Sequence, residues 1–137
     1  MLKVLIVDDS LIIRKKISKI FENLGHELVF AATNGHEAID AFKKYKPDLI
    51  TMDITMPDMD GITAVKHIIK YDENAKIIMV TSHGQEDMVI KSIQAGAISY
   101  ILKPITEEKM AGVISEVFIE YQTQIEEDEV QLTEYDL

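Results

Sequence analysis

The stretch Leu49-Ile50-Thr51-Met52-Asp53 runs directly into Ile54-Thr55-Met56-Pro57-Asp58-Met59-Asp60-Gly61. A continuous apolar run of this length predicts a buried strand. Pro57 and the Asp60-Gly61 pair predict a turn after it. A carboxylate just beyond the carboxyl end of a buried parallel strand lies where open α/β sheets place their binding sites. Asp53 is therefore the first candidate for a functional residue.

Short apolar runs alternate with longer amphipathic ones on both sides of this stretch. Strands are predicted over 2–7, 27–31, 48–52, 76–80 and 98–102. Between and after them, apolar residues recur at helical spacing: Ile13, Ile17, Ile20, Phe21 and Leu24; Ala38, Ile39, Phe42 and Tyr45; Ile62, Val65, Ile68 and Ile69; Val89, Ile90, Ile93 and Ala97; Met110, Val113, Ile114, Val117, Phe118 and Tyr121. Five strand–helix units indicate an α/β fold, a five-stranded parallel sheet with five helices on its two faces.

Composition limits the classes of protein to which this sequence belongs. The chain has 137 residues, a formal net charge of −10 and no Cys. One domain with one core suits this length, and neither a disulfide nor a Cys-based zinc site is possible. Binding to nucleic acid or an anionic membrane needs clustered Lys and Arg, which this charge disfavours. No apolar run approaches the roughly 20 residues of a membrane span, so we expect a soluble, cytoplasmic protein. The sequence does not fix its oligomeric state, for which a monomer is the expectation.

The predicted sheet brings polar side chains from four strands to one edge. Asp8-Asp9-Ser10 follows the first strand, Asp53 the third, Thr81-Ser82-His83 the fourth and Lys103-Pro104 the fifth. Right-handed crossovers align the carboxyl ends of all the strands at the same edge. We therefore expect three carboxylates, a hydroxyl and an ammonium group to lie close together.

Three neighbouring carboxylates repel one another unless a cation lies among them. Mg²⁺ is a hard ion that takes one or two carboxylates, keeps several waters and shares the oxygens of a phosphate group. Lys103 and Thr81 could bind other phosphoryl oxygens, and an Asp carboxylate is a known phosphoryl acceptor. The residues thus predict a Mg²⁺-dependent phosphoryl-transfer site with Asp53 as the nucleophile.

The residues that carry this chemistry also match a known family. They are Asp8-Asp9, Asp53 with Met56-Pro57-x-Met59-Asp60-Gly61, Thr81, Tyr100 and Lys103-Pro104. In this order they resemble the receiver domains of two-component response regulators, close to the stand-alone chemotaxis (CheY-like) type. The resemblance covers residues 2–121 and implies a flavodoxin-like, doubly wound sheet of order 2-1-3-4-5, the strand order for which CheY is a standard example. We expect residues 122–137 to form a separate acidic tail.

The resemblance implies a role for each of these residues. A histidine kinase would phosphorylate Asp53. Mg²⁺ would be bound by Asp53, by Asp9 directly, by Asp8 largely through water, and by the backbone carbonyl of Thr55. Lys103 would pair with the phosphoryl group, and the bond before Pro104 is typically cis.

The resemblance also implies how the signal is passed on. Thr81 and Tyr100 would move on phosphorylation, and Thr55 and His83 would tune the loss of the phosphoryl group. The surface formed by the fourth helix, the fifth strand and the fifth helix would then bind a target, such as a flagellar motor switch or a relay protein. We expect exposed apolar residues there, Val89 and Ile101, to serve that target or a dimer.

Several alternatives remain open from the residues alone. Asp8 and Asp9 could instead cap the first helix. A haloacid-dehalogenase-like phosphatase also uses an Asp nucleophile with Mg²⁺, but its second Asp would stand where Thr55 does. A flavodoxin-like electron carrier would need a phosphate loop in place of Asp8-Asp9. Within the receiver family, the chain could be a phosphate sink or a relay intermediate rather than a switch.

Overall fold

The computed structural model describes residues 1–82 and 86–118, in which five strands alternate with five helices. The elements are β1 (Lys3–Val7), α1 (Leu11–Asn23), β2 (Glu27–Ala32), α2 (Gly35–Tyr45), β3 (Leu49–Met52), α3 (Gly61–Tyr71), β4 (Ile77–Thr81), α4 (Glu86–Ala95), β5 (Ser99–Leu102) and α5 (Glu107–Val117). All neighbouring strands pair in parallel, in the order β2-β1-β3-β4-β5. The predicted fold class and strand order are confirmed.

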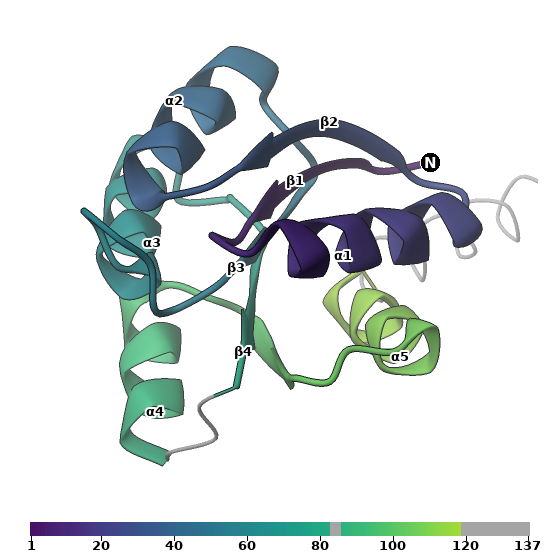
Figure 1. Ribbon diagram of the computed structural model, residues 1–137. Coiled ribbons are helices and arrows are strands. Elements are labelled where there is room, and N and C mark those ends of the chain that lie inside the picture. The colour runs from purple at the N-terminus through teal and green to yellow at the C-terminus, as the bar shows by residue number, and fades with distance from the viewer. Residues whose placement is uncertain (83–85, 119–137) are drawn as a thin grey trace, which may run out of the picture.

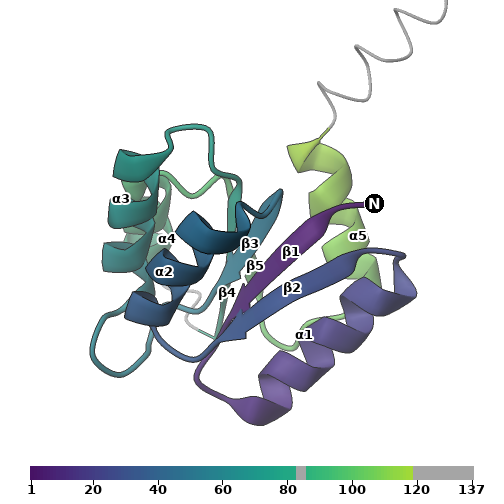
Figure 2. The ribbon, with the colours of Figure 1, turned by 90° about the horizontal axis from the view of Figure 1, so that it is seen from above.

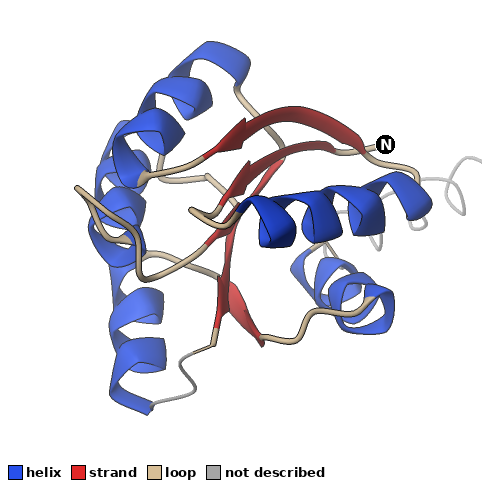
Figure 3. Ribbon diagram, in the orientation of Figure 1, coloured by secondary structure: helices blue, strands red, loops and turns tan. Residues whose placement is uncertain are grey.

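Helices cover both faces of this sheet (Figures 1 and 2), and the layer of strands lies between them (Figure 3). α1 and α5 lie on one face, and α2, α3 and α4 lie on the other. Because alternate residues of a strand point to opposite faces of the sheet, the core consists of two clusters, one on each face. Leu5 and Val7 pack toward α2 and α3, whereas Val4 and Ile6 pack toward α1 and α5. The central strands are therefore buried on both faces, as the continuous apolar runs predict.

The helices begin on short polar side chains that accept hydrogen bonds from the first turn. Caps of this kind are Ser10, Asn34, Asp60 and Thr106, at the starts of α1, α2, α3 and α5. Ser10 caps α1, because its side chain accepts a hydrogen bond from the Ile13 amide. The alternative that Asp8 or Asp9 caps this helix is therefore not the arrangement found.

One predicted apolar stripe is wrong at two of its four residues, since Val89 is half-buried and Ala97, just beyond α4, is buried as expected. Ile90 and Ile93 of α4 are exposed, and the helix instead turns Met88, Ser92 and Ala95 toward the core. Ser92 tolerates full burial because its hydroxyl donates to the Met88 carbonyl at 2.8 Å. A serine can thus occupy a core position that a hydrophobic pattern assigns to an isoleucine.

Some sequence-based expectations fall outside the described residues. They concern His83, Tyr121, the domain boundary at residue 121 and the acidic tail over 122–137. Among the residues that the structure describes, no helix has both the length and the apolar character needed to cross a membrane.

Gly61 allows the turn after β3 to close against the backbone of Asp53. A Cβ atom at Gly61 would lie 1.9 Å from the Asp53 carbonyl oxygen, and the Gly61 amide donates to the Ile54 carbonyl at 2.7 Å. Glycine is therefore required at position 61 by a close backbone approach.

We predict that Gly61→Ala lowers the free energy of unfolding by about 2 kcal/mol or more, because backbone must move to relieve the clash. Gly112→Ala is the matched control: its Cβ would meet nothing within 4 Å in α5, and we expect it to stabilise by about 0.5–1 kcal/mol. Urea unfolding of both variants tests this. Equal effects of the two substitutions would contradict it.

Candidate functional site

Backbone hydrogen bonds continue beyond the strands and align their carboxyl ends. The Asp53 amide donates to the Val7 carbonyl at 3.0 Å, and the Lys103 amide donates to the Thr81 carbonyl at 2.8 Å. Val7 pairs with Met52 in the parallel register, so the residues that follow them, Asp8 and Asp53, start from the same level of the sheet. The strand ends therefore fix where each polar side chain begins.

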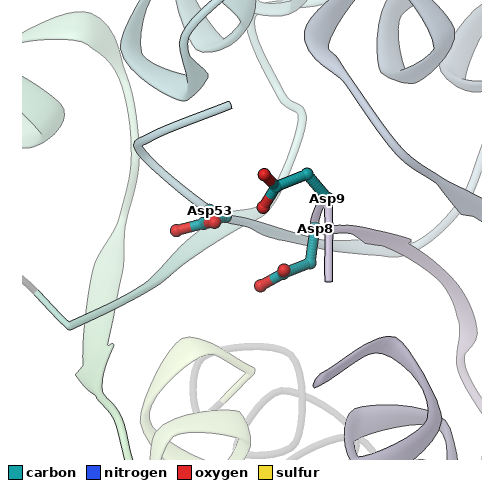
Figure 4. Close-up of side chains that lie close together, drawn as sticks. All are labelled: Asp8, Asp9 and Asp53. Atoms are coloured by element: carbon teal, nitrogen blue, oxygen red, sulfur yellow. The ribbon is translucent and has the colours of Figure 1, made fainter. Parts of the chain in front are cut away.

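Three carboxylates converge at this edge, Asp8 and Asp9 from the end of β1 and Asp53 from the end of β3 (Figure 4). Each offers one oxygen that lies within 4.8 Å of the other two. Asp8 and Asp53 are buried, whereas Asp9 is exposed. The cluster is thus closed on the side of the sheet and open on the side of Asp9.

Lys103 brings a positive charge to the two buried carboxylates. Its Nζ atom lies 3.0 Å from Asp8 Oδ2 and 3.6 Å from Asp53 Oδ1. The peptide bond between Lys103 and Pro104 is cis, as the resemblance implies. The ammonium group is therefore held closest to Asp8 and remains within reach of Asp53.

Further contacts hold Asp8 in place, and no sequence pattern points to them. The Ser10 amide donates to Asp8 Oδ1 at 2.9 Å, and Arg14 Nη1 donates to the Asp8 backbone carbonyl at 2.7 Å. Arg14 comes from the first turns of α1, so it braces the β1–α1 loop. A contact from a side chain to a backbone atom leaves no periodic signal in a sequence, which is why Arg14 was not predicted.

Burial raises the pKa of Asp53 from 3.8 to about 6, and repulsion from Asp8 adds to this rise. The Lys103 ammonium and the Ile54 amide act in the opposite direction, but they offset only part of it. The ionised form of Asp53 is therefore less favoured in the folded protein than in an exposed Asp. A divalent cation beside the carboxylates would favour the ionised form, which is the form that can act as a nucleophile.

The cluster fits Mg²⁺ in the chemistry and the spacing of its donors. Oxygens at about 2.1 Å from an octahedral Mg²⁺ lie about 3.0 Å apart when adjacent and about 4.2 Å apart when opposite. Three carboxylate oxygens within 4.8 Å of one another suit that arrangement with little movement. The open side at Asp9 leaves room for the waters that Mg²⁺ usually keeps.

The other predicted site residues lie around this cluster. Thr81 is fully buried at the end of β4, and Thr55 is exposed two residues after Asp53. Tyr100 is 43% exposed on β5, so it lies outward in this structure. His83 is outside the described residues. The roles of Thr81, Tyr100, Thr55 and His83 remain predictions.

The apolar surface near α4 and β5 differs in detail from the expected one. Ile101 is buried and Val89 is half-buried; the exposed apolar residues are Ile90, Ile93, Ile98, Tyr100 and Leu102. Along β5, alternate side chains face opposite sides of the sheet, and Ile101 faces the side on which α1 and α5 pack. The expectation of an exposed Ile101 was therefore wrong by one residue.

The raised pKa of Asp53 leads to a prediction about stability. The folded protein binds a proton at Asp53 more tightly than the unfolded chain, so the contribution of Asp53 to stability falls as pH rises from about 4 to about 6 and stays lower above that. Asp53→Asn removes this charge. Without Mg²⁺, we expect the variant to be more stable than the parent by roughly 2 kcal/mol at pH 8 and nearly equal to it at pH 4.

Urea unfolding at pH 4, 6 and 8 in the presence of a chelator measures this difference. Asp40→Asn, on an exposed position of α2, is the control, and we expect no comparable pH-dependent gain. A gain for Asp53→Asn that is the same at pH 4 and pH 8 would show that burial of the charge is not its cause.

Known proteins share both the sequence motifs and the fold of this chain. The family model of the response regulator receiver domain matches residues 4–115. The chemotaxis protein CheY of Thermotoga maritima is 46% identical over 115 residues, which cover 84% of this chain and 96% of the relative. CheY of Bacillus subtilis is 47% identical over 113 residues, covering 82% of this chain and 94% of the relative.

A solved structure supports the same assignment. A chain of the CheX–CheY–BeF₃–Mg²⁺ complex from Borrelia burgdorferi superposes with a TM-score of 0.82 and 38% identity, covering 85% of this chain and 88% of that chain. The fold, the order of motifs along the chain and the sequence relatives agree. The chain belongs to the response regulator receiver domain family.

Proposed function

We propose that this chain is a phosphorylation-controlled signalling switch that accepts a phosphoryl group on Asp53 from the phosphohistidine of a histidine kinase. The observation that carries the proposal is the placement of Asp53 in a cluster of carboxylates beside Lys103. Receiver domains are signalling switches, and the sequence relatives named above are chemotaxis proteins. On that ground we assign this switch to a chemotaxis pathway.

Asp53 would act as the nucleophile. One of its carboxylate oxygens attacks the phosphorus of the donor, a phosphorus–oxygen bond forms, and the phosphorus–nitrogen bond to the donor imidazole breaks. The imidazole leaves with the electron pair of that bond. Asp53 can attack only when ionised, so the positive charge of Lys103 nearby favours the reactive form.

The acids at the end of β1 would hold the cofactor. Asp9, Asp53 and the Thr55 carbonyl would bind Mg²⁺ directly, and Asp8 largely through water. When bound, Mg²⁺ would neutralise charge on the acids and on the transferred group. Asp8 is already paired with Lys103 at 3.0 Å, which supports its place in the outer position. The solved relative that contains Mg²⁺ and BeF₃ also supports the use of this cofactor.

Lys103 and Thr81 would bind the phosphoryl group once it is attached. Lys103 is 3.6 Å from Asp53 in the ion-free protein, so a small movement brings it to the new oxygens. Thr81 comes from the end of β4, and its carbonyl is hydrogen-bonded to the Lys103 amide. The backbones of the two residues are therefore linked directly.

The output surface would be α4, β5 and α5. Tyr100 is exposed here and would turn inward when Thr81 moves toward the phosphoryl group. A groove of about 420 Å³ lies between β5 and α5, and Tyr100 and Leu102 line it. Such a surface could bind a motor switch or relay protein in one state only. A histidine kinase acts where ATP is available, which agrees with a cytoplasmic location.

The phosphatase alternative receives no support. A haloacid-dehalogenase-like mechanism needs a second acid two residues after the nucleophile, and that position holds Thr55. The family model and the relatives named above are all of the receiver type.

The acceptor is tested by intact mass after incubation with acetyl phosphate and Mg²⁺. We expect the parent and Asp40→Asn to gain one labile phosphoryl group and Asp53→Asn to gain none, because an amide is not a nucleophile of this kind. Omission of Mg²⁺ should abolish the gain. A folded Asp53→Asn variant that still gains a phosphoryl group would place the acceptor elsewhere.

The part played by Lys103 is tested by Lys103→Ala. We expect it to spare Mg²⁺ binding, measured by calorimetry, because the ammonium group is not a ligand. It should also remove the amide shifts of β5 that accompany phosphorylation in the parent, measured by nuclear magnetic resonance. Lys70→Ala, exposed on α3, is the control. Normal shifts in Lys103→Ala would remove this residue from the switch.

A further inference from the structure

A groove of about 300 Å³ lies between α1 and the edge strand β2, away from the output surface. Figure 2 shows the helix running beside this strand. Its lining combines basic and apolar side chains: Arg14, Lys15 and Lys19 with Leu11, Leu28 and Ala31. Leu11 is 56% exposed and Leu28 is 37% exposed. The phosphoryl-transfer site makes no use of this apolar surface.

The charge of α1 stands out against that of the whole chain. The helix carries Arg14, Lys15, Lys16 and Lys19 against one acid, Glu22, while the chain has a net charge of −10. Glu22 also lines the groove and pairs with Lys19 at 3.9 Å. Lys15 remains exposed on the rim, and Arg14 is tied to the Asp8 carbonyl. An occupant of this groove would therefore be both acidic and partly apolar.

The chain itself contains a segment of that chemistry. Residues 125–130 read Ile-Glu-Glu-Asp-Glu-Val, four consecutive acids between two β-branched apolar residues, and residues 122–137 contain no Lys or Arg. We propose that the acidic segment 125–130 binds the basic groove between α1 and β2 of the same molecule. This proposal does not depend on phosphorylation of Asp53.

The length of the chain permits this contact. Phe118, at the end of α5, packs in the same hydrophobic cluster as Ile17, Ile20 and Phe21 of α1. The eight peptide units from Phe118 to Glu126 can span about 26 Å, whereas a helix of 13 residues is about 20 Å long. The length of this connection is therefore of the same order as that of α1, which allows the acids to reach the part of α1 nearest Phe118.

Attachment to the same chain makes even a weak contact effective. A short flexible connection gives an effective concentration of about 1 mM, so a contact with a dissociation constant near 1 mM would be formed about half of the time. Exposed ion pairs contribute little each, and several of them together with apolar contacts can reach this modest affinity. Salt should weaken the contact, because the charges are at the surface.

Occupation of the groove would have a consequence for other partners. Leu11 follows Ser10 directly, so the groove opens next to the β1–α1 loop that carries Asp8 and Asp9. A segment bound there would exclude any partner that approaches this loop over α1. The segment would thus compete with such partners for this surface of α1.

The absence of Cys from the chain makes a direct test simple. A nitroxide attached to Gln131→Cys reports on every amide near it. At low salt, we expect α1 amide peaks from Leu11 to Lys19 to lose at least half of their intensity relative to those of α3, which lies on the other face of the sheet (Figure 2). At about 1 M salt, where the Debye length is about 3 Å, the loss should disappear.

Charge reversal supplies the matched comparison. Lys15→Glu with Lys19→Glu should abolish the loss along α1, whereas Lys66→Glu with Lys70→Glu, an exposed pair with the same spacing on α3, should leave it unchanged. An isotope-labelled parent mixed with an unlabelled nitroxide-bearing copy shows whether the contact is between molecules. The proposal is overturned if α1 and α3 broaden equally, if the α1 pair has no effect, or if the broadening arises only between molecules.

Discussion

Mutual repulsion of three carboxylates is the constraint on which the functional edge of this protein depends. The oxygens of Asp8, Asp9 and Asp53 lie within 4.8 Å of one another, and two of the residues are buried. Such an arrangement opposes folding, so the remainder of the structure must hold it together. It does so through strand-end hydrogen bonds, through Lys103 and through a core that is packed on both faces of the sheet. Because the three acids are held close together despite their repulsion, a bound cation or an added phosphoryl group strongly changes the electrostatic energy of the cluster.

Residues at strand ends were the most predictable part of the site. Asp8, Asp53 and Lys103 each follow an apolar run, and a parallel sheet allows only one edge at which those run ends can meet. The sheet order and the family were likewise predicted and confirmed. These predictions succeeded because β1, β3 and β4 are buried on both faces and therefore consist of continuous apolar runs. The end of each run marks the end of the strand.

The errors share a different physical origin. The phase of β5 was misjudged at Ile101 because an edge strand is only partly covered, so apolar residues occur on both of its faces. The stripe of α4 was misjudged because Ser92 satisfies its own hydroxyl within the helix. Arg14 was missed because its partner is a backbone carbonyl. In each case the deciding interaction depends on where a neighbouring atom lies in space, which periodicity along the chain does not record.

The position of β5 at the edge of the sheet affects how easily this strand can separate from its neighbour. Among the described strands, β1, β3 and β4 have a strand on each side, whereas β5 pairs only with β4 over four residues. Separation of an edge strand breaks backbone hydrogen bonds along one side only, and elements that move are drawn from the less stable parts of a fold. The acids follow β1 and β3, which are inner strands of the sheet, whereas Tyr100 lies on β5, at the edge of the sheet. The acids thus follow strands that are paired on both sides, and the hydrogen bond from the Lys103 amide to the Thr81 carbonyl joins the ends of β5 and β4.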